Sequence, residues 1–228
     1  MREFFLSTRI PKILGSTESE ISAQIESTAQ FINKISEIDP IFNTWYINNA
    51  TSSKPPLDYP FPSESAKNYL LQKRQKNIND SILLWNAQVE SSQFASFRFD
   101  RVSILMTFKK VLETEQVIKL FNALLECFKF EYVYLNTDFF SDISVYPHRR
   151  EITSICYVPV KIEDNYLPHL YQKVEVENNL NQGTILVFDK NWADETDELK
   201  KIVQENSIAL IELGVIPEAG LPDGFFNE

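Results

Sequence analysis

The stretch "SFRFDRVSILMTFKK", residues 96–110, decides the fold class of this chain. Apolar and polar residues alternate on both sides of Asp100 and Arg101, which is the pattern of two half-buried strands joined by a tight turn. Strands joined in this way pair antiparallel. On the second strand, one face is expected to carry Val102, Ile104, Met106 and Phe108. The stretch therefore predicts a β-hairpin in the middle of the chain.

Segments with helical spacing lie on either side of this hairpin. In residues 16–38 isoleucines recur at helical spacing, and Thr17 and Glu20 stand three apart as a capping box. Further helices are expected over residues 64–77, 114–129 and 194–214. Further strands are expected over residues 2–10, 43–48, 81–89, 131–136, 152–160, 173–178 and 183–189.

Strands and helices interleave irregularly along the chain, with adjacent strands in its middle. This order predicts an α+β fold in which a mostly antiparallel sheet is packed with several helices. We expect a single domain over residues 1–228, with a stiff loop at residues 50–63, where four prolines occur. That loop is interpreted as a solvated connector. The alternative is a proline-rich ligand through which an adaptor protein docks other domains.

The composition narrows the class of protein. Hydrophobic residues make up 43% of the chain, enough to fold, but glycines number only 5 and no phosphate-binding glycine motif is present. The opening apolar run is too short for a signal peptide, and no later stretch is long enough to span a bilayer. Cys127 and Cys156 lack metal-ligand spacing. They are interpreted as small buried side chains of a reduced, cytoplasmic protein, with a disulfide as the alternative.

The negative charge is concentrated near the C-terminal end. The net charge of the chain is −10, and residues 161–228 hold 14 acidic against 5 basic residues. A polyanion needs a basic stripe, so we expect no direct contact with nucleic acid and no membrane partner. A basic protein is a compatible partner. For the charge taken by itself, simple solubility is the preferred explanation.

Few residues suggest catalysis. His148 stands beside Arg149, Arg150 and Glu151, where cationic neighbours would lower its pKa and suit a general base. Adjacent side chains on an extended segment point to alternate faces, however, so a solvated loop is the preferred interpretation. His169 stands among apolar residues and is expected to pack. We expect no catalytic residue, no metal site and no cofactor.

The densest group of carboxylates lies in "DKNWADETDELKK", residues 189–201. Acidic residues in a first helical turn each stabilise the helix by roughly 0.3–1 kcal/mol through its dipole. Stabilisation of the helix start explains the presence of one or two of these carboxylates. The others exceed what the helix start requires and suggest a different role. The spacing does not fit a calcium-binding loop. The four central carboxylates are Asp194, Glu195, Asp197 and Glu198.

Two tryptophans admit different roles. Trp85 lies in an apolar strand and is expected in the core. Trp192 lies in a polar loop, where it either packs on the first turn of the following helix or stands exposed as an anchor for a partner.

Several segments together resemble the immunity protein 52 family of bacterial polymorphic toxin systems. They are an early strand and helix, then "DPIFNTWYI" at residues 39–47, "GTILVFDKNW" at 183–192, and a helix closing in "ALIELGVIP" at 209–217. The similarity in order spans most of the chain. Its motifs are short, and the regions 50–63 and 139–172 have no counterpart.

The resemblance implies an α+β protein without catalytic activity that binds and neutralises a cognate toxin, with nucleases as the expected toxins. A basic nuclease surface would suit an acidic inhibitor. The expected partner-binding residues are Asp189, Trp192, Asp194, Glu195, Asp197 and Glu198, with Glu175 and Glu177 extending the patch. The alternative function is a small metal-dependent hydrolase or nuclease that uses scattered carboxylates.

Overall fold

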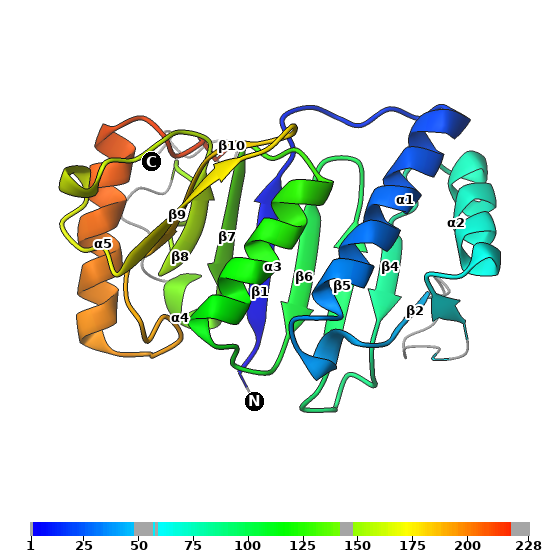
Figure 1. Cartoon of the computed structure of the whole chain (residues 1–228), viewed down its shortest axis with the longest axis horizontal. Coiled ribbons are helices and arrows are strands. Elements are labelled where there is room, and N and C mark those ends of the chain that lie inside the picture. The colour runs from blue at the N-terminus through cyan, green and yellow to red at the C-terminus, as the bar shows by residue number, and fades with distance from the viewer. Residues whose placement is uncertain (1, 48–56, 58, 142–147, 220–228) are drawn as a thin grey trace, which may run out of the picture.

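The computed structural model describes residues 2–47, 57, 59–141 and 148–219, and within them ten strands form one continuous sheet (Figure 1). The strand order is β3-β2-β4-β5-β6-β1-β7-β8-β10-β9, and the neighbouring strands pair antiparallel. The prediction of an α+β fold with a mostly antiparallel sheet is confirmed. The strands are β1 (Phe4–Arg9), β2 (Trp45–Ile47), β3 (Pro60–Phe61), β4 (Ile82–Trp85), β5 (Ala95–Phe99), β6 (Ile104–Phe108), β7 (Tyr132–Asn136), β8 (Ile155–Val158), β9 (Gln172–Glu177) and β10 (Gln182–Val187).

The helices follow the predicted order, each a few residues shorter than its sequence pattern. Within the described residues, none of them is long and apolar enough to cross a membrane. The α-helices are α1 (Glu18–Ile35), α2 (Glu64–Lys76), α3 (Thr114–Cys127), the short α4 (Asp138–Ser141) and α5 (Asp197–Glu212). Two 3₁₀ turns, η1 (Pro40–Phe42) and η2 (Asp164–Tyr166), complete the elements.

Strands β5 and β6 form the expected hairpin, with Phe99 opposite Ile104. The carboxylate of Asp100 closes the turn by accepting hydrogen bonds from the backbone N–H groups of Val102 at 2.9 Å and Ser103 at 2.8 Å. The other predicted core residues of β6 are buried, but Val102 lies in the turn and is 50% exposed. The prediction for Val102 was wrong because the strand begins only at Ile104.

Strand β1 joins the two halves of the sheet. It pairs with β6 on one side and with β7 on the other, and its side chains Phe4 and Leu6 are fully buried. The alternation of residues 2–10 predicts a strand here. The central position of that strand depends on pairing with segments about a hundred residues away.

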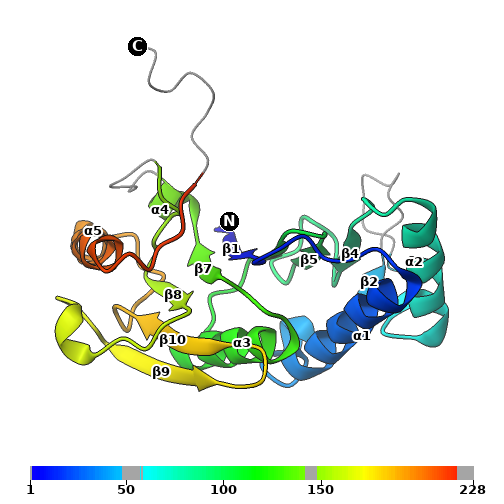
Figure 2. The same ribbon diagram turned by 90° about the horizontal axis from the view of Figure 1, so that it is seen from above.

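Helices cover the two faces of the sheet unequally (Figure 2). Helices α1 and α3, with Ala66 and Leu70 of α2, pack on one face and form the larger core with it. Helix α5 lies on the opposite face near β8 and β10, where Cys156, Leu186 and Leu199 belong to a second core. In the described part of the chain no helix covers that opposite face over β1, β4 and β5 (Figure 2). We call this region the open face.

The antiparallel register arranges the side chains of the open face in rows, because residues directly opposite each other point to the same side of a sheet. Trp85 belongs to the first row. It is half-buried and packs against Phe94, with ring centroids 5.6 Å apart, so its expected place in the core was wrong. The first row is Tyr46, Trp85, Ser96, Thr107, Phe5 and Asn136, and the second is Leu83, Arg98, Leu105, Ser7 and Tyr134.

The helix ends follow local sequence signals. The backbone N–H of Glu20 donates to the hydroxyl of Thr17 at 3.3 Å, and the carboxylate of Glu20 accepts from the backbone N–H of Thr17 at 2.9 Å. The predicted capping box of α1 is thereby confirmed. Gly214, just beyond α5, has φ = 71°, the left-handed conformation that glycine adopts without steric cost.

The two cysteines are free and buried in different cores. Burial raises the pKa of Cys127 to about 11 and that of Cys156 to about 12. Both thiols are therefore neutral at physiological pH, as expected of small buried side chains. The alternative of a disulfide between them does not hold in this structure.

A buried carboxylate connects the end of α1 to the start of α3. Asp39 is 4% exposed and accepts hydrogen bonds from the ammonium of Lys110 at 2.7 Å, the amide of Gln116 at 3.0 Å and the backbone N–H of Ile41 at 3.0 Å. Burial acts to raise the pKa of Asp39, but these hydrogen bonds together bring it below its ordinary value.

Replacing Asp39 by asparagine is expected to lower the free energy of unfolding by roughly 1–3 kcal/mol at neutral pH, because the buried donors lose an ionised acceptor. A carboxylate with a lowered folded-state pKa adds stability that is complete above its unfolded value of about 3.9 and is lost as the pH falls through the folded value. Denaturant unfolding at neutral and acidic pH measures both effects. The D39N protein should lose less stability between neutral and acidic pH than the original chain. If both proteins lose the same amount, Asp39 does not have a lowered pKa in the folded state.

Candidate functional site

The start of β1 and the end of β7 bring two distant carboxylates together. These strands pair with Phe5 opposite Asn136. Glu3 directly precedes β1 and Asp138 is the first residue of α4, two positions after the end of β7, so the pairing brings both residues to the same end of these strands. Glu3 is half-buried and forms an ion pair with Lys109 at 3.2 Å, while Asp138 is exposed at the start of α4.

A third carboxylate comes from the loop between β10 and α5. Trp192 fastens this loop: it is 2% exposed, its indole N–H donates to the carbonyl of Leu112 at 3.2 Å, and its ring meets Phe4 edge-on at 5.1 Å. Its backbone carbonyl also accepts a hydrogen bond from the hydroxyl of Ser154 at 2.6 Å. Because the loop is held against the start of β1, Glu195 reaches Arg2 and pairs with it at 3.0 Å.

These residues line a shallow hollow of about 710 Å³, which we call the acidic hollow. The carboxylates in it come from three segments separated by more than fifty residues each. Phe139 supplies an apolar, half-buried surface beside them. The lining consists of Arg2, Glu3, Asp138, Phe139 and Glu195.

The turn that leads into α5 adds exposed carboxylates next to the hollow. Thr196 caps the helix, since its hydroxyl accepts the backbone N–H of Leu199 at 3.2 Å. Asp194, Asp197 and Glu198 are exposed, and none of them has an ion-pair partner in the described part of the chain. The cap is made by a hydroxyl, so these carboxylates remain available for contact with a cation.

Only some of the expected partner-binding residues lie together on the surface of the structure. Trp192 was expected as a possible exposed anchor, but it is buried because it packs between β1 and the segment before α3. Asp189 is half-buried, and its carboxylate accepts the backbone N–H of Asn191 at 2.7 Å, so it shapes the loop. Neither residue therefore presents a free side chain to a partner in this structure.

Glu175 and Glu177 lie elsewhere. Glu177 pairs with Gln182 at the start of β10, whereas the acidic turn follows the end of β10. At about 3.3 Å per residue, the two groups are separated by roughly 20 Å along the strand. Both carboxylates also pair with Lys161, at 3.3 and 3.4 Å. The patch therefore does not extend to them.

Sequence reasoning missed Glu3, Asp138 and Phe139. Nothing in the local pattern around residues 3 and 138 distinguishes them from ordinary strand ends. The pairing of β1 with β7 and the packing of Trp192 on Phe4 together bring them to the same place as Glu195, and both are long-range properties of the fold.

Each histidine lies beside side chains that form hydrogen bonds within the fold. Nε2 of His169 lies 2.5 Å from a carboxylate oxygen of Glu205, and this hydrogen bond lowers the pKa of Glu205. Beside His148, Arg149 donates to the carbonyl of Ile216 at 3.1 Å. Among the described residues, no three His, Cys, Asp or Glu side chains come together as a possible metal site.

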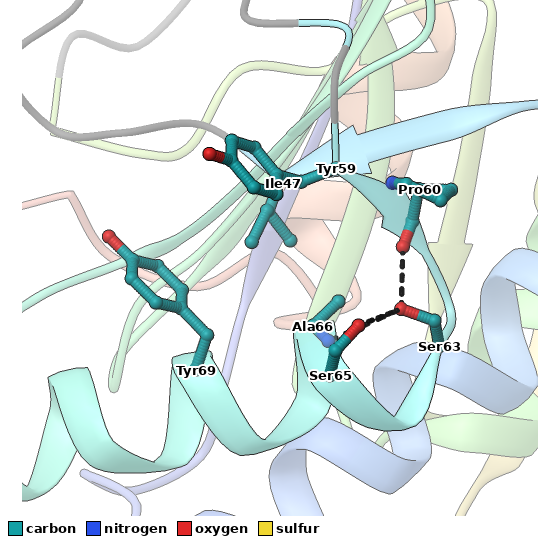
Figure 3. A pocket seen from close by; sticks show the side chains of 7 residues that line it. All are labelled: Ile47, Tyr59, Pro60, Ser63, Ser65, Ala66 and Tyr69. Atoms are coloured by element: carbon teal, nitrogen blue, oxygen red, sulfur yellow. Dashed lines mark hydrogen bonds between the residues drawn. The ribbon is translucent and has the colours of Figure 1, made fainter.

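A second hollow of about 370 Å³ lies at the β3 edge of the sheet, between β3 and α2 (Figure 3). Tyr59 and Tyr69 point to the same side of it, 59% and 42% exposed, with Ile47 between them (Figure 3). Among the described residues that line it, none is charged. The buried Phe61 belongs to the same segment, so this part of the proline-rich stretch is built into the sheet edge, whereas residues 50–56 and 58 lie outside the described residues.

Comparison with known proteins leaves the chain without an assigned family: no family model matches it, and no curated protein matches it. The resemblance to the immunity protein 52 family therefore depends on the sequence segments alone. In the structure these segments form η1 and β2, then β10 with the loop after it, and the end of α5.

Proposed function

We propose that this chain is an immunity protein of a bacterial polymorphic toxin system, acting in the cytoplasm by direct binding to a basic toxin domain of the nuclease class. The observation that supports this most is the acidic hollow. Carboxylates from three distant segments gather there, next to three exposed carboxylates that have no ion-pair partner among the described residues. A lysine or arginine of a partner fits such a surface, with Phe139 beside it for apolar contact.

The carboxylates of the acidic hollow and of the turn beside it would also speed association with a basic toxin, and an inhibitor of a toxin needs fast association. Complementary fields speed the encounter of two proteins by about 10- to 1000-fold over the neutral case. A nuclease carries cationic surfaces for its substrate, and an acidic protein that covers them is attracted by the same charges. The resemblance of the chain to an immunity family points to the same kind of partner.

The test is growth rescue in a bacterial host that expresses the toxin domain encoded next to this chain, combined with affinity capture from the same cells. Rescue with a stoichiometric complex is the expected result. Rescue without a complex would point to an enzyme that repairs the damage or modifies the toxin. A failure of both would overturn the proposal.

Neutralising the three unpaired carboxylates is expected to slow association with the toxin domain by about tenfold and to make it less sensitive to salt. The variant is Asp194→Asn, Asp197→Asn and Glu198→Gln, and stopped-flow or surface-binding kinetics at several ionic strengths measure the rate. Side chains of similar size keep the hollow intact.

A matched control removes three exposed carboxylates elsewhere: Glu18→Gln, Glu37→Gln and Glu90→Gln. This control changes the net charge by the same amount, and Glu18 also occupies a first helical turn. An equal slowing in both variants would assign the effect to total charge. An unchanged rate in the first variant would exclude the acidic hollow as the contact surface.

A further inference from the structure

A groove of about 530 Å³ crosses the open face where β1 ends, between β6 and β7. Its charged lining is entirely cationic within the described residues: Arg9 from β1, Lys12 from the segment after β1, and Arg150 from the segment before β8. This is notable in a chain with a net charge of −10. We call it the cationic groove.

The three cations differ in how firmly they are held. Nε of Arg9 pairs with Glu131 at 2.8 Å and its Nη1 donates to the carbonyl of Glu218 at 2.8 Å, so this guanidinium is fixed in place. Lys12 and Arg150 are exposed, and in the described part of the chain neither side chain has an ion-pair partner. The groove thus combines one oriented cation with two that have no ion-pair partner among the described residues.

The rest of the lining is partly apolar. Leu105, Ser7 and Tyr134 lie side by side in the second row of the open face and form part of the lining. At its rim Ile13 is 64% exposed and Val102 is 50% exposed. These surfaces offer contact to the uncharged part of a ligand.

In the described part of the chain no carboxylate forms an ion pair with Lys12 or Arg150, although the charge of Arg150 acts on Glu151 and opposes the effect of burial on the pKa of that carboxyl. Glu131 is engaged with Arg9, and Asp100 is engaged with the backbone of its own turn. Glu151 accepts a hydrogen bond from the amide of Asn136 at 2.6 Å, and burial raises the pKa of its carboxyl. None of the three lines the groove.

We propose that the cationic groove binds a small phosphate-bearing molecule with an apolar or aromatic body. Lys12 and Arg150, which have no ion-pair partner among the described residues, line the groove beside the oriented guanidinium of Arg9 and match a multivalent anion, and arginine matches the geometry of phosphate oxygens. The volume falls within the range of about 300–1000 Å³ found for small-molecule sites. The body of the ligand packs against Tyr134 and the apolar rim. This proposal is independent of the toxin partner, because the groove and the acidic hollow share no residue.

The experiment is calorimetric titration of the full chain, without partner, with inorganic pyrophosphate, ADP and citrate at low salt. We expect pyrophosphate to bind and ADP to bind more tightly. The variant Lys12→Gln with Arg150→Gln should weaken both by about tenfold or more, since two charge-assisted contacts are lost. The control Lys76→Gln with Lys119→Gln removes two exposed cations outside the groove and should bind like the original chain.

A third variant distinguishes the contribution of the phosphate groups to binding from that of the uncharged body of the ligand. Ile13→Ser, at an exposed position, should weaken ADP by a few fold and leave pyrophosphate unchanged. The proposal is overturned if pyrophosphate does not bind, or if the control loses affinity as much as the groove variant. If citrate binds as tightly as pyrophosphate, the groove is a general site for polyanions and the proposal of a phosphate site is overturned. Because no toxin is present, these results leave the test of the proposed function unaffected.

Discussion

Replacing Trp192 by alanine is expected to lower the free energy of unfolding by about 3–5 kcal/mol, the range observed when a buried tryptophan or phenylalanine is truncated in a core. The side chain is 2% exposed, meets Phe4 at 5.1 Å and donates its indole N–H to the carbonyl of Leu112. Its removal leaves a cavity and an unsatisfied carbonyl between β1 and the segment before α3. Denaturant unfolding followed by circular dichroism measures the loss.

Trp192→Phe is the matched variant, because it keeps the aromatic packing and loses only the hydrogen bond and part of the volume. Its cost should be smaller, on the order of 1 kcal/mol for the hydrogen bond together with the lost ring contacts. An exposed anchor would behave differently. Alanine at an exposed position changes stability by only about 0.5 kcal/mol or less. If Trp192→Ala lowers the free energy of unfolding by so little, Trp192 is exposed and can belong to the partner-binding surface.

Replacing Arg74 by methionine is expected to raise the free energy of unfolding by about 1–4 kcal/mol, as found when buried charged groups give way to apolar ones of similar size. Arg74 faces inward from α2 together with Ala66 and Leu70, and it is 1% exposed. Its three guanidinium nitrogens have no hydrogen-bond partner among the described residues. The ring of Phe99 lies 6.0 Å from Cζ and offers a weak cation–π contact.

The electrostatics of Arg74 agree with this expectation. Burial lowers the pKa of its guanidinium and the charge of Arg101 lowers it further, and these two effects outweigh the charges of Asp100 and Asp80, which act to raise it. Lys76→Met, an exposed cation at the end of the same helix, is the control and should change stability by about 0.5 kcal/mol or less. If the Arg74 variant is less stable than the original chain, the guanidinium has a compensating partner that outweighs its burial.

The sequence by itself determined the elements whose causes are local. The alternation around Asp100 produced the β5–β6 hairpin, and Thr17 with Glu20 produced the start of α1. Gly214 ended α5 because glycine adopts φ = 71° without strain. These signals act over a few residues, so they can be read from one segment at a time. The α+β class followed from their order.

The tertiary structure alone decided which residues meet. The place of β1 between β6 and β7 brought Glu3 and Asp138 to one hollow, and the packing of Trp192 on Phe4 brought Glu195 to the same hollow. The inward turn of Arg74 was equally hidden, since arginine side chains are almost never fully buried unless they are paired. Pairing between strands far apart in the chain and the burial of single side chains depend on the whole set of contacts. A periodic pattern records only which face is apolar, and it carries no information on the partner of that face.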